Sequence, residues 1–89
     1  MMLGFTCSSF DLFHAGHVSM LRDSKAHCDY LICGLQVDPT IDRAEKNSPT
    51  QTIVERYTQL QAIKYADEII PHATESDLLD ILMMLPINV

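Results

Sequence analysis

The sequence predicts an α/β fold, an open parallel sheet with helices on both faces that is incomplete at its carboxyl end. Short apolar runs alternate with stretches whose apolar residues recur at helical spacing, in the order strand, helix, strand, helix, strand, helix. Such alternation favours parallel strands joined by right-handed helical crossovers. With 89 residues, the chain has the length of one small domain, so residues 1–89 are interpreted as a single, partial domain.

The first half of the chain supplies two predicted strands and one predicted helix. Residues 2–7 form a short, mostly apolar run that is typical of a buried strand, and residues 8–16 then interrupt the pattern with serines, an aspartate and a glycine. Apolar side chains recur at helical spacing from His17 to Cys28, which predicts a helix. Residues 30–35 are mostly apolar, as expected of a strand that is buried on both faces.

The second half begins with a polar segment, residues 38–51, which contains two prolines and is predicted to be a loop. Thr52 and Glu55 have the spacing of a capping box, so a helix is predicted to start here. Residues 68–71 are predicted to form a third strand. A second cap signal at residues 74–77 precedes a leucine-rich helix, and residues 87–89 are predicted to open a fourth strand.

Composition and charge exclude several classes of function. A formal net charge of −6 argues against a general nucleic-acid-binding module, although a few placed donors suffice for a single nucleotide. Three cysteines without CxxC spacing give no disulfide framework and indicate a reducing compartment. No apolar run approaches the ~20 residues of a membrane span, and no signal peptide is recognised. We therefore expect a cytoplasmic protein without a membrane span.

The loop after the first strand is the first candidate site, because ligands of open parallel sheets bind beyond the carboxyl ends of the strands. His17 falls at the start of the predicted helix, where unpaired N–H groups and the helix dipole favour an anion. His14 and His17 can each donate one N–H to a phosphate oxygen, and Gly16 lets the backbone approach that phosphate closely. His27 and His72 are interpreted as solvated or capping residues.

The segment Phe10-Asp-Leu-Phe-His-Ala-Gly-His17 resembles the Gly-Thr-Phe-Asp-x-x-His-x-Gly-His pattern of the cytidylyltransferase family, in particular of glycerol-3-phosphate cytidylyltransferase. Downstream, residues 64–70 are similar to the family's Arg-Tyr-Val-Asp-Glu-Val-Ile segment, which lies at the family's dimer interface. Asp38, Lys46 and Arg56 fall where the family has an acidic residue, a lysine-bearing loop and an arginine. The resemblance implies a Rossmann-like nucleotidyltransferase fold and a homodimer.

The resemblance also implies an enzyme of phospholipid or cell-wall precursor biosynthesis. The phosphate of a small alcohol phosphate, by default glycerol-3-phosphate, would attack the α-phosphorus of CTP and release pyrophosphate. Mg²⁺ would be bound through the nucleotide phosphates, and no metal site on the protein is expected. The implied catalytic residues are His14, His17 and Lys46. The implied nucleotide-binding residues are Ser8, Ser9, Phe10, Asp11, His14, Gly16 and His17. The implied substrate-binding residues are Asp38, Lys46, Arg56 and Lys64.

The sequence departs from the family pattern at three places. Ser8 stands where the family has a glycine that allows close approach or positive φ, and Lys64 stands where the family has an arginine. The family's C-terminal part, with its Arg-Thr-x-Gly-Ile-Ser-Thr-Thr motif, is not in this sequence. The chain therefore resembles a truncated form.

Three alternative functions stay open. Relatives that share His-x-Gly-His use ATP, so an adenylyltransferase is a close variant. The His14-x-x-His17 spacing also occurs in zinc sites, although no cluster of cysteine and histidine flanks the pair. A third alternative is a truncated, non-catalytic module that pairs with a partner through an apolar helix stripe and an open sheet edge.

Overall fold

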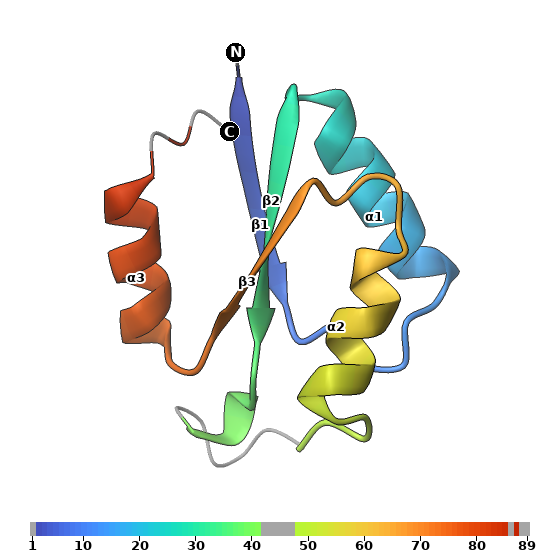
Figure 1. Ribbon diagram of the computed structural model, residues 1–89, viewed down its shortest axis with the longest axis vertical. Coiled ribbons are helices and arrows are strands. Elements are labelled where there is room, and N and C mark those ends of the chain that lie inside the picture. Colours follow the sequence, from blue (N-terminus) through green and yellow to red (C-terminus); the bar gives the residue numbers. More distant parts are fainter. Residues whose placement is uncertain (1, 42–47, 86, 88–89) are drawn as a thin grey trace.

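The computed structural model describes residues 2–41, 48–85 and 87 of the chain. Strands and helices alternate along the chain (Figure 1). The elements are β1 (Leu3–Ser8), α1 (Ala15–Ala26), β2 (Tyr30–Gln36), η1 (Pro39–Ile41), α2 (Ile53–Gln61), β3 (Glu68–His72) and α3 (Glu75–Met84). Their order and the parallel pairing of the strands confirm the predicted fold class.

Several element bounds differ from the sequence predictions. Helix α1 begins at Ala15 rather than His17, because His14 caps it. The predicted loop of residues 38–51 contains a single 3₁₀ turn, η1, within its described part. Of the predicted fourth strand, residues 88–89 lie outside the described residues, and Ile87 is not in a strand.

The sheet has the order β1-β2-β3, and all described strand pairs are parallel. Ser8 lies opposite Leu35, and Gln36 lies opposite His72, so the three strands end at one edge, which we call the carboxyl edge. Both crossovers step across the sheet in the same direction. Right-handed crossovers then place α1 and α2 on the same face, and α3 covers the opposite face (Figure 1).

The hydrophobic core lies between the sheet and the helices α1 and α2. Its buried members are Phe10, Leu21, Leu31, Cys33, Leu35 and Leu60. Each fully buried leucine or phenylalanine stabilises the fold by about 1.5–3 kcal/mol, so this face supplies most of the packing energy. Helix α3 has no fully buried residue, so the opposite face is more loosely packed. None of the helices in the described part of the chain is long and apolar enough to cross a bilayer.

Candidate functional site

The loop between β1 and α1 holds two residues in the left-handed backbone region. Phe10 has φ 50° and Leu12 has φ 48°, a conformation that costs roughly 1–2 kcal/mol for a residue with a side chain. Ser8, which replaces the family's glycine, is not among the residues with positive φ. The serine therefore introduces no backbone strain at the end of β1, and its Oγ accepts a hydrogen bond from the Phe10 N–H at 3.3 Å.

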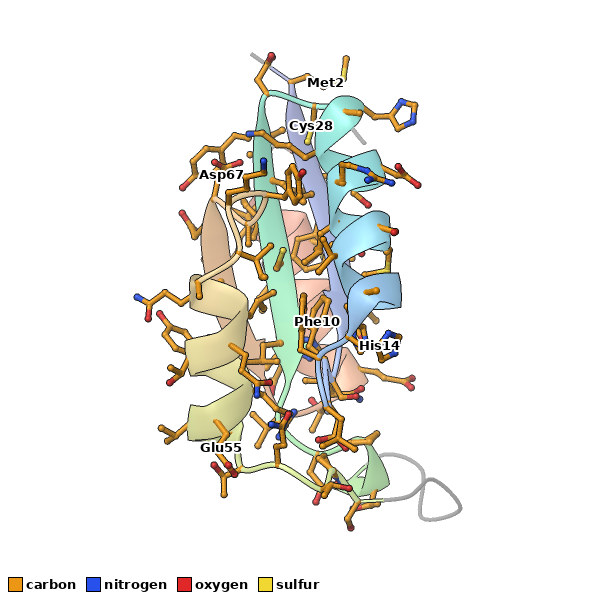
Figure 2. All side chains as sticks on the ribbon, turned by 90° about the vertical axis from the view of Figure 1, so that its right-hand side faces the viewer. Met2, Phe10, His14, Cys28, Glu55 and Asp67 are labelled. Carbon is orange, nitrogen blue, oxygen red and sulfur yellow. The ribbon has the colours of Figure 1, made fainter. Side chains whose placement is uncertain are left out.

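Asp11 fastens this loop to the segment that precedes α2. Its carboxylate accepts hydrogen bonds from the backbone N–H groups of Thr50 at 2.8 Å and Gln51 at 2.9 Å, and these bonds lower the pKa of Asp11. The Leu12 N–H donates to the Gln51 side chain at 2.7 Å. Figure 2 shows Phe10 between the sheet and α1, and its side chain is fully buried in the core. The side chains of Phe10 and Asp11 thus hold the loop in place, and their expected contacts with a nucleotide stay predictions.

Arg56 occupies the centre of the carboxyl edge. Its side chain is only 2% exposed, and its N–H groups donate to four backbone carbonyl oxygens. Nη1 donates to Ser9 at 3.0 Å and to Gln36 at 2.6 Å, Nη2 to Val37 at 2.5 Å, and Nε to Gln51 at 3.2 Å. Four of the five N–H donors of Arg56 are thus used within the fold, and its expected contact with substrate stays a prediction.

His14 and His17 cap the amino end of α1 reciprocally. The Gly16 N–H donates to Nδ1 of His14 at 2.9 Å, and the His14 N–H donates to Nδ1 of His17 at 3.1 Å. The two imidazole rings lie side by side, with their centroids 4.1 Å apart. This is the geometry of a capping box, but it is built from two imidazoles instead of a hydroxyl and a carboxylate.

The hydrogen bonds of the two rings assign their tautomers. Because Nδ1 of each ring accepts a hydrogen bond, the ring proton of a neutral imidazole must reside on Nε2. Each ring then presents one Nε2–H donor beside the amino end of α1, where the helix dipole also favours an anion. A zinc ion would need an unprotonated Nε2, so this arrangement suits an anion and does not suit a metal.

His17 is held in the neutral form by its surroundings. Its ring stacks on Phe13 at 5.0 Å and lies 5.8 Å from the Phe10 ring. Burial lowers the pKa of His17, and the neighbouring His14 lowers it further. At neutral pH, Nδ1 of His17 therefore remains the acceptor in the helix cap, and its Nε2–H remains a donor.

Gly16 makes room for the ring of its neighbour. A Cβ atom at this position would lie 2.7 Å from Cε1 of His14, which is closer than real Cβ contacts. The sequence interpretation assigned Gly16 to close approach of a phosphate. The structure adds a different requirement, since a side chain at Gly16 would displace the His14 ring from its cap.

The remaining expected site residues are spread over the fold. Asp38 follows β2 at the carboxyl edge, where its carboxylate accepts hydrogen bonds from the Thr40 N–H and hydroxyl, and these bonds lower its pKa. Ser9 contributes its backbone carbonyl to Arg56. Lys46 lies outside the described residues. Lys64 lies near Tyr65 in the connection that leads into β3, and hence at the amino edge of the sheet. The histidine pair lies at the opposite edge of the sheet, and the expected contact of Lys64 with substrate stays a prediction.

One residue of the carboxyl edge was not assigned a site from the sequence. His72 was interpreted as solvated or capping, but only 6% of it is exposed, and it lines a cavity next to the end of β1. The available signal was its position directly after the predicted third strand, at the edge where ligands bind.

Comparison with known proteins supports the assignment of a family. A family model described as Cytidylyltransferase-like matches residues 5–82. The ethanolamine-phosphate cytidylyltransferase of Mus musculus is 44% identical over 64 residues, which are 72% of this chain and 16% of that protein. The bifunctional protein HldE of Caulobacter sp. (strain K31) is 41% identical over 69 residues, 76% of this chain and 14% of that protein. The chain therefore spans less than a fifth of the length of these curated relatives.

A solved structure agrees with the fold. The lipopolysaccharide core biosynthesis protein from Thermoplasma volcanium GSS1 superposes with a TM-score of 0.81 and 25% sequence identity, over 94% of this chain and 67% of that chain. The matched curated relatives are named for ethanolamine phosphate or as HldE, whereas the sequence interpretation set glycerol-3-phosphate first. Since the family model covers most of the chain and the fold agrees with it, the chain belongs to the cytidylyltransferase-like family.

Proposed function

We propose that this chain is the nucleotide-binding part of a nucleotidyltransferase that transfers a cytidylyl group from CTP to a small alcohol phosphate. The observation that carries the proposal is the pair of capped imidazoles, each with an Nε2–H donor, at the amino end of α1. Donors fixed in advance, where negative charge develops, are the principal means of catalysing phosphoryl-type transfers.

In the proposed reaction, an oxygen of the acceptor phosphate attacks the α-phosphorus of CTP. A new P–O bond forms while the bond to the β-phosphate oxygen breaks, and pyrophosphate leaves with that electron pair. No covalent bond to the protein is needed, so the chain contributes alignment and charge stabilisation. His14 and His17 would donate to phosphate oxygens, and Ser9 and Lys46 are proposed to contact the phosphates from the adjoining loops.

Three cations in the described part of the chain are poorly placed to neutralise a triphosphate. Arg56 is turned toward backbone carbonyls, Lys25 pairs with Asp67 at 2.5 Å, and Lys64 lies at the amino edge. Among the described residues, no group of three histidine, cysteine, aspartate or glutamate side chains lies together in a way that could hold a metal ion. We propose that Mg²⁺ enters with the nucleotide, held by phosphate oxygens, and offsets their charge.

The identity of the acceptor and the identity of the nucleotide base are the more specific parts of the proposal. Ethanolamine phosphate is the first acceptor to test, because curated relatives from Mus musculus and Encephalitozoon cuniculi are named for it. Glycerol-3-phosphate, which the sequence motif favours, is the second. CTP and ATP are compared directly, since the sequence motif is compatible with either nucleotide.

The test separates phosphate binding from helix capping. His14→Asn keeps a side-chain acceptor that suits an N-cap but removes the Nε2–H donor. His17→Glu keeps the acceptor of a capping box and replaces the donor with a negative charge. A lost hydrogen bond to a charged group is worth about 1.5–3 kcal/mol, so we expect each variant to bind CTP and magnesium about ten- to a hundredfold more weakly in isothermal titration.

Circular dichroism melting supplies the control, because both variants should retain the thermal midpoint of the unchanged chain to within a few degrees. Equal affinity for CTP in all three proteins, with intact folds, would refute the proposed role of the pair. If ATP binds more tightly than CTP, the proposed mechanism is retained, and adenine takes the place of cytosine as the base of the nucleotide.

A further inference from the structure

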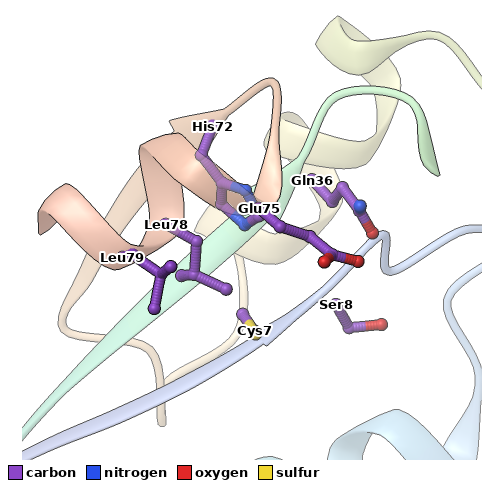
Figure 3. Close-up of a pocket in the computed structure, with 7 residues that line it drawn as sticks. All are labelled: Cys7, Ser8, Gln36, His72, Glu75, Leu78 and Leu79. Carbon is purple, nitrogen blue, oxygen red and sulfur yellow. The ribbon is translucent and has the colours of Figure 1, made fainter. Parts of the chain in front are cut away.

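A cavity of about 350 Å³ opens at the carboxyl edge, on the face of the sheet that α3 covers. Figure 3 shows that its walls come from the ends of the strands and from the first turns of α3. Cys7 and Gln36 lie near the ends of β1 and β2, His72 ends β3, and Glu75 and Leu78 lie on α3. The cavity is thus bounded by all three strands at the edge where ligands of parallel sheets bind.

His72 is the side chain that points to a ligand. It is only 6% exposed, and neither Nδ1 nor Nε2 has a hydrogen-bond partner among the described residues. Buried polar groups in folded proteins are nearly always paired, so two unpaired ring nitrogens that line a cavity indicate a missing partner. Gly34 on β2 creates the space for this ring, since a Cβ atom there would lie 3.3 Å from Cδ2 of His72.

The chemistry of the walls selects the kind of partner. Glu75 supplies a carboxylate in the first turn of α3. Gln36 offers an amide and His72 offers two ring nitrogens, and none of the described residues that line the cavity is a lysine or an arginine. Leu78 and Leu79 form an apolar side wall. A small group that carries N–H donors, a positive charge and a short alkyl chain fits these walls.

The cavity adjoins the candidate nucleotide site. Ser8, the last residue of β1, lines the cavity, and the loop that follows it leads to His14 and α1 on the other face of the sheet. A molecule that is bound at the end of β1 can therefore direct one end toward the histidine pair and the other end under α3. A small alcohol phosphate has two such ends.

We propose that this cavity binds the alcohol end of the acceptor, and that His72 and Glu75 select a phosphorylated amino alcohol over a phosphorylated polyol. The inference rests on the proposed function, because it takes the acceptor to be an alcohol phosphate. Within it, Glu75 pairs with the ammonium group, and a ring nitrogen of His72 accepts from the same group. Glu75 and His72 are then specificity-determining residues of the acceptor site.

The test compares ethanolamine phosphate with glycerol-3-phosphate by isothermal titration of the full chain in the presence of CTP and magnesium. Loss of one charge-assisted pair should weaken ethanolamine phosphate binding about tenfold in Glu75→Gln, with glycerol-3-phosphate affinity changed by less than about twofold. His72→Phe, which keeps ring volume and removes both nitrogens, should act in the same direction. Asp80→Asn is the matched control, an exposed carboxylate on α3 that does not line the cavity.

Ring signals of His72 in nuclear magnetic resonance spectra give a second readout. The inference predicts that ethanolamine phosphate shifts the ring signals of His72 and that glycerol-3-phosphate does not. Intact CTP binding with the same preference between acceptors in Glu75→Gln, His72→Phe and the unchanged chain would overturn the inference and leave the proposed function standing. Shifted His72 signals in a chain that fails to bind CTP would support the cavity and count against the nucleotide assignment. If His72→Phe does not fold, Glu75→Gln and the ring signals decide.

Discussion

His17 is a partly buried histidine whose protonation would cost the fold a hydrogen bond. Its Nδ1 accepts from the His14 N–H, and a second proton on the ring would place two donors face to face. Burial and the nearby His14 ring both lower its pKa, so the unfolded chain binds this proton more readily than the folded chain does. The chain is therefore expected to lose stability as the pH falls.

The expected window lies just below the ordinary histidine pKa of about 6.5, because the folded pKa is below that value. Stability from His17 is fully present above this value and is lost as the pH falls through the folded pKa. Urea unfolding between about pH 8 and pH 5 would measure the effect, since Asp11, Asp38 and Asp67 have lowered pKa values and titrate below this range. His17→Gln should flatten the dependence, and an equal slope in both proteins would contradict the prediction.

Arg56 joins three segments that are far apart in the sequence. Its guanidinium group binds carbonyls before α1, after β2 and before α2, and nearby Asp11 and Asp38 offset its charge. An arginine with four carbonyl partners is a positioning residue for the whole carboxyl edge.

Replacement of this residue should therefore be costly. We expect Arg56→Met to lower the free energy of unfolding by about 3–5 kcal/mol, since each buried carbonyl left without a donor costs about 1–3 kcal/mol. Arg56→Lys should recover only part of this, because an ammonium group cannot reach carbonyls in a fork. Chemical denaturation checks both, with exposed Arg22→Met on α1 as the control. A midpoint for Arg56→Met equal to that of the control would refute this role.

Sequence reasoning located the residues whose chemistry depends on local order and missed those whose role depends on tertiary contacts. His14 and His17 were found because a strand-to-helix loop at a sheet edge favours anions. Arg56 was assigned to substrate by resemblance, and only the fold shows the carbonyls around its buried side chain. Lys64 was assigned by resemblance, whereas its place at the amino edge follows from strand direction.

Among the elements, α1 shows how a helix start can escape a sequence pattern. Histidine is not a preferred N-cap residue, so the prediction placed the start at the first apolar spacing instead of at Ala15. The starts of α2 and α3, in contrast, are confirmed, because Thr52 and Thr74 form capping boxes of the ordinary kind. Capping patterns in the sequence thus predicted the starts of α2 and α3 correctly. They failed for α1, where two imidazoles replace the usual cap.

The substitution Gly16→Ala tests this unusual cap, because the direction in which it changes the thermal midpoint depends on the His14 ring. Alanine in place of glycine ordinarily stabilises a helix by about 0.5–1 kcal/mol. Here the added Cβ would lie 2.7 Å from the His14 ring, so we expect the thermal midpoint to fall and CTP affinity to fall with it. Ser19→Ala, at an exposed position of α1, should give the ordinary small increase. A stabilised Gly16→Ala chain with unchanged CTP affinity would show that the ring does not need this space.

On the scale of the whole molecule, the two faces of the sheet differ in how well they are covered. The α1 and α2 face holds the buried core cluster, whereas α3 has no fully buried residue and leaves Leu79 61%, Met83 84% and Met84 83% exposed. β1 is also an edge strand of the described sheet. Exposed apolar side chains beside an open edge are features of a surface that pairs with another chain.

We therefore expect the 89-residue chain to self-associate through α3. Sedimentation velocity at increasing protein concentration should show a rising mean sedimentation coefficient, because association driven by apolar burial follows mass action. Met83→Lys combined with Met84→Glu removes the exposed apolar tip without changing net charge, and should return the chain to a monomer with the thermal midpoint retained. Val54→Thr on α2, which is 70% exposed, is the control and should leave association unchanged. A monomer at every concentration would contradict this prediction, and association unaffected by the α3 substitutions would direct attention to the edge of β1 or β3.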